Sequence, residues 1–279
     1  MESLGVYWDV TFGNHDSENY NYHNRAAVAQ MYSDPDLEYC LLRSEDGGVF
    51  GDCNHTISLQ DTNGLIRECF IMIDSNSYTE DDPLGIGWDY DCIREDQILW
   101  YENVIESYSD MNTEIYESLP EESRPSDFDA FTTVKSMMFM HIPIREVKVA
   151  YEDFVNNNRQ NTENTKYLGG NDGESDPVVY CSEREEELFE TISLLGSTEA
   201  LFYGHDHLNS FVLEYKGVVL SYGYSIDYLA YFGIKGKGYQ RGCTMIEIDA
   251  DGTFDITHEN YYQDKYPSLY EKETVNLDK

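Results

Sequence analysis

Three short histidine motifs constrain this chain more than any other feature of its sequence. They are Gly13-Asn14-His15-Asp16, Met140-His141-Ile142-Pro143 and Gly204-His205-Asp206-His207. Apolar and β-prone residues come before each motif, which predicts three strands that end there. Loops that follow strands in layered α/β folds converge from distant parts of a sequence, so functional sites gather at such ends. Imidazole nitrogens and an amide oxygen are suitable ligands for Zn, Fe or Mn.

Each motif by itself has an ordinary interpretation. A single histidine such as His141 is more often a buried residue with a hydrogen-bonded ring than a metal ligand. A His-x-His turn alone is about as often a metal-binding turn as a purely structural one. The three motifs together, each at a strand end, favour a shared metal site. His23, His55 and His258 lack this context, and we interpret them as ordinary polar residues.

The pattern along the chain predicts a layered α/β architecture. Helices are expected at 24–32, 93–108, 145–155 and 183–195, and strands at 5–10, 54–59, 68–74, 134–140 and 200–203. A run of strands with glycine turns is expected from 211 to about 261. The polar segment 110–129 and the Asn-, Gly- and Thr-rich segment 156–176 read as loops, the second one a long surface loop. Helix–strand alternation followed by a β-rich end predicts layered sheets with outer helices.

The acidic composition limits the partners. The 279 residues contain 18 Lys and Arg against 54 Asp and Glu, so the net charge is 18 − 54 = −36. Such a surface repels polyanions, and we expect neither nucleic acid nor an anionic membrane as a partner. The charge has two interpretations that the sequence leaves open: solubility, for example in a salty cytoplasm, or compensation of bound divalent cations.

Cysteine usage and hydropathy indicate a reducing compartment. The length suits one large domain or two small ones, and we expect a single domain, residues 1–279. The six cysteines are scattered and form no Cys-x-x-Cys pair, which favours reduced thiols over a zinc site or a disulfide framework. No apolar run approaches the roughly 20 residues of a membrane span, and the first residues do not resemble a signal peptide. These features predict a cytoplasmic protein, and they leave its oligomeric state open.

The motifs resemble a known family. Gly13-Asn14-His15-Asp16, His141-Ile142-Pro143 with Glu146, and Gly204-His205-Asp206-His207 are similar to the third, fourth and fifth motifs of the calcineurin-like metallophosphoesterases. The finer pattern is similar to the branch that includes plant purple-acid-phosphatase-29-like and yeast Dcr2-like proteins. Asp74-Ser75, the stretch Asp96–Tyr101 and Arg241-Gly242 also fit that branch. The resemblance runs from Val6 to about Asp249, and it implies an αββα sandwich of two sheets with outer helices.

The resemblance also implies roles for individual residues. His15 matches the histidine that contacts the phosphate and can protonate the leaving group, and Asp16 matches the carboxylate that would orient and charge that imidazole. Two cations about 3.5–4 Å apart clamp the phosphate in a complete family site and generate the attacking hydroxide. The matching metal ligands are Asn14, His141 and His205 for the second metal, and His207 for the first.

The chain departs from the family pattern at its start. The family has two earlier motifs, DxH and GDxxD, whereas only twelve residues precede Gly13-Asn14-His15-Asp16 here. The stretch Gly51–His55 looks like GDxxD, but it comes after the first histidine motif and lacks the final Asp, so we interpret it as the start of a strand pair. We therefore expect a domain truncated at its N-terminus that holds at most one divalent ion. Asp16 and Asp206 are the first candidates for replacement carboxylates.

These observations predict a metal-dependent phosphoester hydrolase with a phosphate-ester substrate and weak activity as this chain. Two explanations of the missing motifs compete. One is a fragment or truncated gene product of an ordinary enzyme, which the intact remaining motifs favour. The other is a degenerate protein that binds one metal or a phosphate group without turnover. A purely structural module is a third class, and an intact Gly204-His205-Asp206-His207 is hard to explain that way.

Overall fold

Strands and helices alternate along most of the chain in a computed structural model, which describes residues 1–18, 20–43, 48–79, 89–184, 186–226, 242–266 and 271–278. The chain, expected to form a single domain, divides by its internal contacts into two units. Unit 1 comprises Met1–Ile142 and Ser182–Glu199, and unit 2 comprises Pro143–Cys181 and Ala200–Lys279. Both units mix helices with strands, which confirms the predicted α/β class.

Three strands organise unit 1. β1 (His55–Gln60) pairs antiparallel with β2 (Ile66–Met72), and β2 pairs parallel with β3 (Ser136–Phe139). This confirms the expected strand pair and the expected strand before His141. Because β2 and β3 run in the same direction, the segments that follow them leave the strands at the same edge.

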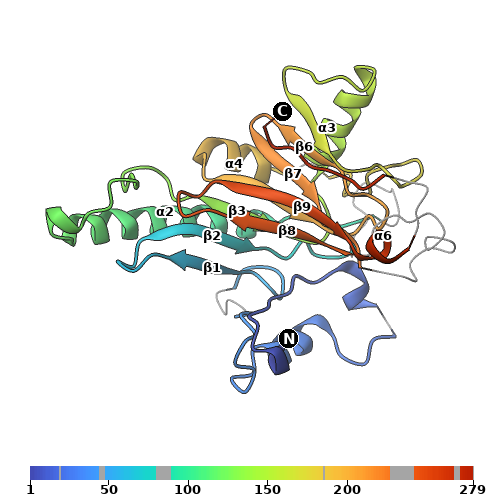
Figure 1. Cartoon of the computed structure of the whole chain (residues 1–279). Coiled ribbons are helices and arrows are strands. Elements are labelled where there is room, and N and C mark those ends of the chain that lie inside the picture. Colours follow the sequence, from blue (N-terminus) through green and yellow to red (C-terminus); the bar gives the residue numbers. More distant parts are fainter. Residues whose placement is uncertain are drawn as a thin grey trace. The chain divides into compact units, whose positions relative to one another are not determined.

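Three helices belong to the same unit. They are α1 (Arg25–Tyr32), α2 (Glu95–Ser118) and α4 (Leu188–Leu195). The side chain of Asn24 accepts a hydrogen bond from the Ala27 amide, so α1 begins at a standard N-cap. α2 lies along β1 and β2 in Figure 1 and contacts both strands through polar side chains as well as apolar ones.

Unit 2 contains a four-stranded group with one helix beside it. The strands lie in the order β5 (Thr198–Tyr203, whose first two residues belong to unit 1), β7 (Val218–Tyr222), β6 (Val212–Tyr215) and β4 (Thr165–Gly169). β5 and β7 are parallel, whereas the other neighbours are antiparallel. α3 (Arg145–Asn156) packs against β4, and the stacked rings of Phe154 and Tyr167 lie 4.8 Å apart.

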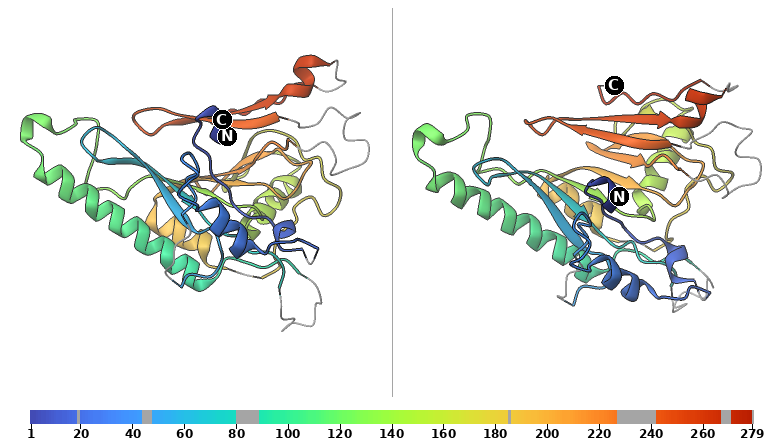
Figure 2. Two further views of the ribbon diagram at one scale, coloured as in Figure 1. Left: turned by 90° about the horizontal axis from the view of Figure 1, so that it is seen from below. Right: turned by 60° about the horizontal axis from the view of Figure 1, so that its bottom comes forward.

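A separate hairpin forms a second sheet in unit 2. β8 (Gly242–Ile248) pairs antiparallel with β9 (Phe254–Asn260), and the short helix α6 (Tyr261–Lys265) follows (Figure 2). The Tyr224 amide donates to the Thr244 hydroxyl at 2.8 Å, and the Asn260 amide donates to the Tyr224 hydroxyl at 2.6 Å. Two sheets with helices are consistent with the expected α/β sandwich of the metallophosphatase type.

Three expectations about local structure differ from what is observed. The segment 5–10 forms no strand, and only Trp8 makes an isolated bridge, to Cys40. α2 continues through the first nine residues of the expected loop 110–129, because Asn112 is buried and bonds both backbone groups of Ile66. The expected surface loop 156–176 contains β4, whose Thr165 is buried. Arg241 lies outside the described residues. Within the described ranges, no helix has the length and apolar character needed to cross a membrane.

Candidate functional site

The first histidine motif forms a short 3-10 turn, η2 (Asn14–Ser17), in unit 1. The Gly13 amide donates to the Asp16 carboxylate at 2.8 Å, and the Asp16 amide donates to the Gly13 carbonyl at 3.2 Å. The resemblance had implied that the Asp16 carboxylate orients the His15 ring. In the structure this carboxylate accepts from the Gly13 amide instead and closes its own turn. The carboxylate beside that ring belongs to Glu18, whose Oε1 lies 2.8 Å from His15 Nδ1.

Asn14 and His141 meet in unit 1, although 127 residues separate them. Asn14 is buried, and its Oδ1 lies 3.1 Å from His141 Nε2. Gly13 makes this approach possible, because a Cβ at that position would lie 2.8 Å from His141 Nε2. Glycine is therefore needed here because the imidazole of His141 passes so close to the backbone. The φ of Gly13 is −96°, a value that any residue adopts.

The segment after β2 supports both partners of this pair. The Ile142 amide donates to the Ser75 hydroxyl at 2.8 Å, which fixes the backbone next to His141. The Ser77 hydroxyl donates to the Asn14 carbonyl at 3.2 Å. The Asn14 side-chain amide donates to the Tyr78 hydroxyl at 2.7 Å. Residues 75–78 therefore connect the turn at Asn14 with the end of β3.

A buried polar network holds the beginning of that segment. Asp74 is fully buried, forms an ion pair with the nearly buried Arg25, and accepts from the Asp52 amide at 2.8 Å and the Asn76 amide at 2.9 Å. The Gln97 side chain donates to the Asp74 carbonyl at 2.7 Å. Buried charges are tolerated when they are paired and hydrogen-bonded in this way. The network anchors the segment that carries Ser75 and Tyr78.

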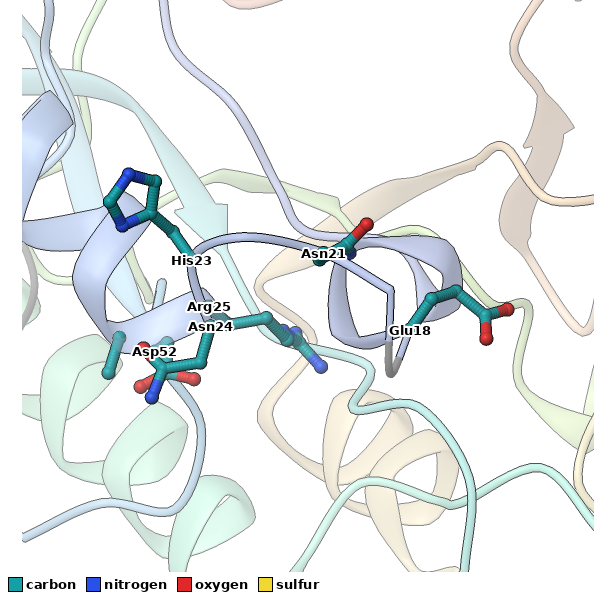
Figure 3. A pocket seen from close by; sticks show the side chains of 7 residues that line it. Glu18, Asn21, His23, Asn24, Arg25 and Asp52 are labelled. Atoms are coloured by element: carbon teal, nitrogen blue, oxygen red, sulfur yellow. The ribbon is translucent and has the colours of Figure 1, made fainter.

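A polar pocket of about 390 Å³ opens beside this network. In the view of Figure 3, Arg25 extends between Asp52 on one side and Glu18 on the other. Burial raises the pKa of Asp52, an effect that Arg25 opposes and Asp74 reinforces. Asn21 donates to the His15 carbonyl at 2.9 Å. The pocket is lined by Glu18, Asn21, His23, Asn24, Arg25, Ala26 and Asp52.

The third histidine motif forms a strained turn in unit 2. His205 has a φ of 69°, in the left-handed region that few non-glycine residues occupy. The positive φ falls on the histidine and not on Gly204. The Asp206 amide donates to the Gly204 carbonyl at 2.8 Å and closes the turn. An observed backbone outlier of this kind is a reason to suspect a functional role.

Asp206 points into the interior of unit 2. Its Oδ2 accepts from the Tyr222 hydroxyl, from the Tyr180 amide at 3.2 Å and from the Asn209 side chain at 3.4 Å. Burial raises the pKa of this carboxyl to about 7, and the hydrogen bond from Tyr222 opposes the shift. The Asp16 carboxylate is bonded within its own turn and the Asp206 carboxylate mainly to Tyr180 and Tyr222, so these contacts give no support to either aspartate as a replacement metal ligand.

The contact between Asn14 and His141 has the length of a hydrogen bond, and the same spacing is compatible with two ligands of one divalent ion. Two ligand atoms bound to one cation at about 2.0–2.2 Å stand roughly 3.0–3.5 Å apart, and the Asn14 Oδ1 to His141 Nε2 distance of 3.1 Å lies in that range. Among the described residues, no three His, Cys, Asp or Glu side chains form a group that could hold a metal. His205 and His207 share one turn of unit 2, and Asn14 and His141 belong to unit 1.

Three curated relatives match the chain, all from Arabidopsis thaliana. "Probable inactive purple acid phosphatase 14" is 26% identical over 261 residues, which cover 89% of this chain and 56% of the relative. "Probable inactive purple acid phosphatase 28" is 24% identical over 243 residues, 81% of this chain and 51% of the relative. "Probable inactive purple acid phosphatase 29" is 39% identical over 62 residues, 22% and 15% of the two chains.

The chain spans about half the length of the first two of these relatives. Their names place them among the purple-acid-phosphatase-like proteins of the metallophosphoesterase superfamily. No family model matches the chain, and no solved structure matches it at a significant level.

Sequence reasoning missed several residues that shape the site. Glu18 could have been found, because a residue three positions after His15 in a tight turn can reach its ring. Tyr78 and Arg25 could not, since their partners lie 64 and 49 residues away in sequence. His55, interpreted as an ordinary polar residue, is buried, and its Nε2 lies 2.6 Å from Asp9 Oδ2.

Proposed function

We propose that this chain carries a metallophosphoesterase-type site that binds a divalent metal ion and a phosphate ester, and that its chemistry is phosphoester hydrolysis. The observation that carries the proposal is the pairing of Asn14 Oδ1 with His141 Nε2 around Gly13. Two motifs far apart in sequence supply donor atoms at the spacing that a shared cation requires. The similarity to purple-acid-phosphatase-like relatives supports the same class.

The proposed ligands in unit 1 are Asn14 and His141. The resemblance also assigns a metal-ligand role to His205 and His207 of unit 2. Their nitrogen and oxygen donors suit Fe, Mn or Zn. When bound, such an ion supplies positive charge for the phosphoryl oxygens and lowers the pKa of bound water. The exposed ring of His15 would give a proton to the leaving oxygen, and His15 directly follows Asn14 in the turn that Gly13 and Asp16 close.

A second candidate function is binding of a metal or phosphate group without turnover. The observation that favours it is the relatives' names, each of which includes the word "inactive". The two candidates share the metal ligands and differ in whether His15 contributes to a measurable rate.

Metal content and hydrolysis together test both candidates. The purified chain and its His141→Ala variant are loaded with Mn²⁺ or Zn²⁺ and analysed for bound metal, with His23→Ala as an exposed histidine control. We expect His141→Ala to lose most of the bound metal and His23→Ala to keep it. Equal metal in all three proteins would refute the ligand assignment.

Hydrolysis of an aryl phosphate then separates the two functions. A general acid typically contributes about 10²–10⁴-fold, so His15→Ala should lower the rate of a hydrolase by a factor in that range. Bound metal together with an aryl phosphatase rate that His15→Ala leaves unchanged would support the binding function.

A further inference from the structure

A chain of polar contacts links the two functional residues of the first motif through Glu18 and Tyr78. Glu18 Oε1 lies 2.8 Å from His15 Nδ1, and the Tyr78 hydroxyl lies 3.5 Å from the same oxygen. The Tyr78 hydroxyl also lies 2.7 Å from Asn14 Nδ2, and Asn14 Oδ1 faces His141 Nε2 at 3.1 Å. All these residues belong to unit 1, and three different segments supply them.

The direction of the hydrogen bonds follows from the chemistry of the groups. An ionised carboxylate only accepts, so the Tyr78 hydroxyl must donate its proton towards Glu18. In its contact with Asn14 the tyrosine oxygen is then the acceptor, and only the NH₂ end of the Asn14 amide can donate to it. The amide oxygen is consequently turned towards His141. Without this constraint the two ends of an asparagine amide are close to interchangeable in shape.

The same carboxylate constrains His15. An imidazole nitrogen next to a carboxylate carries its proton there, so Glu18 favours a proton on Nδ1. The other nitrogen, Nε2, is left to face a substrate. In the cationic ring, Nε2 holds the proton that a general acid would transfer. One glutamate therefore acts on the amide of Asn14 through Tyr78 and on the ring of His15 directly.

We propose that Glu18 and Tyr78 are positioning residues that set the amide orientation of Asn14 and the protonated nitrogen of His15. The orientation puts an oxygen, the atom that a cation needs, beside His141. The catalytic meaning of this arrangement rests on the proposed function, whereas the arrangement itself is testable without metal or substrate.

The local sequence does not assign these roles to other residues. Asp16 is the carboxylate nearest in sequence to His15, and its Oδ2 accepts from the Gly13 amide instead. Tyr20 and Tyr22, close to the same motif, are 80% and 94% exposed. These residues therefore provide matched controls that differ from Glu18 and Tyr78 in contacts and not in chemistry.

Nuclear magnetic resonance of the full chain, labelled with ¹⁵N at histidine and asparagine, tests the positioning. At a pH where the ring is neutral, we expect the His15 signals of the wild type to report a proton on Nδ1. Glu18→Gln should move that proton largely to Nε2, whereas Asp16→Asn should leave it on Nδ1. Tyr78→Phe should shift the side-chain NH₂ signals of Asn14, and Tyr22→Phe should not.

Metal binding supplies the second readout. Removing a partner behind a metal ligand typically costs about 10–100-fold in affinity, so Tyr78→Phe should weaken Mn²⁺ or Zn²⁺ binding by a factor in that range. Tyr22→Phe should leave the affinity unchanged. If Tyr78→Phe prevents folding, Glu18→Gln carries the test through the His15 signals.

The outcomes separate this inference from the proposed function. A His15 ring that is unaffected by Glu18→Gln, or that responds equally to Asp16→Asn, would overturn the positioning role whatever metal is bound. A wild type that shows the expected His15 and Asn14 signals but binds no metal would support the positioning and refute the proposed function.

Discussion

Glu68 on β2 provides a sharp test of the energetics of unit 1. Its side chain is 1% exposed, and neither carboxylate oxygen has a hydrogen-bond partner among the described residues. Burial, reinforced by Glu199 and opposed by Lys135, raises the pKa of Glu68 from 4.5 to about 8. A carboxyl group in this position is more stable protonated than ionised.

The sign of the effect on stability follows from proton binding. Because the folded state holds this proton more tightly than the unfolded state does, the free energy of unfolding falls as the pH rises between about 4.5 and 8. At about 1.4 kcal/mol per pKa unit, the penalty is about 3 kcal/mol at pH 7 and at most about 5 kcal/mol above pH 8. Below pH 4.5 the penalty disappears.

We expect Glu68→Gln to remove this pH-dependent penalty while keeping the shape of the side chain. The assay is urea unfolding of wild type and variant at pH 5.5 and pH 8.5, analysed as the difference between the two proteins. Subtraction removes the general repulsion of a chain with a net charge of −36. The variant should gain about 2–4 kcal/mol relative to the wild type between the two pH values.

A matched control distinguishes burial from charge. Glu106 on α2 of the same unit is exposed, so Glu106→Gln should show no such difference between the two pH values. The reasoning would be refuted if the stability difference between wild type and Glu68→Gln were the same at pH 5.5 and pH 8.5.

Two further substitutions test the geometry around the candidate site. Gly13→Ala should destabilise the chain by about 1–3 kcal/mol, because the new Cβ would lie 2.8 Å from His141 Nε2; thermal unfolding of a double-mutant cycle with His141→Ala checks this, and additive effects would argue against the contact. Arg25→Met should cost about 3–5 kcal/mol by leaving the buried Asp74 without its cation; urea unfolding should show partial recovery when Asp74→Asn is added, and no recovery would count against the ion pair.

The sequence correctly predicted those helices and strands whose formation depends mainly on the propensities of their own residues. Local β propensity predicted the strand pair β1–β2, the strand before His141 and the β-rich tail. The first two are confirmed, and the tail is confirmed in its described parts, because residues 227–241 lie outside the described residues. The helix closed by Gly196 is confirmed at its end, where that glycine has a φ of 63°. Local composition therefore located the strand ends before His141 and before Gly204, whereas the first histidine motif follows a segment that forms no strand.

The errors arise where tertiary contacts override local composition. α2 continues to Ser118 because the Asn112 side chain bonds the backbone N–H and C=O groups of Ile66. A count of apolar residues does not detect such contacts. β4 forms within a polar segment because the Asp153 carboxylate accepts from Thr162 and Thr165 and holds the chain next to β6. Polar side chains that bond across the fold cannot be recognised from spacing alone.

The candidate site was predictable in its histidines and not in what holds them. The resemblance assigned Asn14 and His141 to one metal, and the structure places Asn14 Oδ1 3.1 Å from His141 Nε2, whereas their role as metal ligands stays a prediction. The role given to Asp16 required knowing which way its carboxylate points, which depends on the Gly13 amide within the turn. Adjacent residues in a sequence do not have to share an orientation.

The two aspartates that follow histidines in the motifs have one structural role in common. Asp16 bonds the backbone of its own turn, and Asp206 bonds the groups beneath its own turn, so each fixes the backbone from which a neighbouring histidine projects. A cation at Asn14 and His141 would then meet neutral donor atoms. The compensating negative charge would come from Glu18, which is linked to Asn14 through the hydroxyl of Tyr78. The imidazole nitrogen favours Zn, Fe or Mn over Mg or Ca, whose ligands in proteins are oxygen atoms. Because the carboxylates of Asp16 and Asp206 bond backbone amides, histidine and asparagine are the remaining candidate ligands, and this affects which metal is favoured.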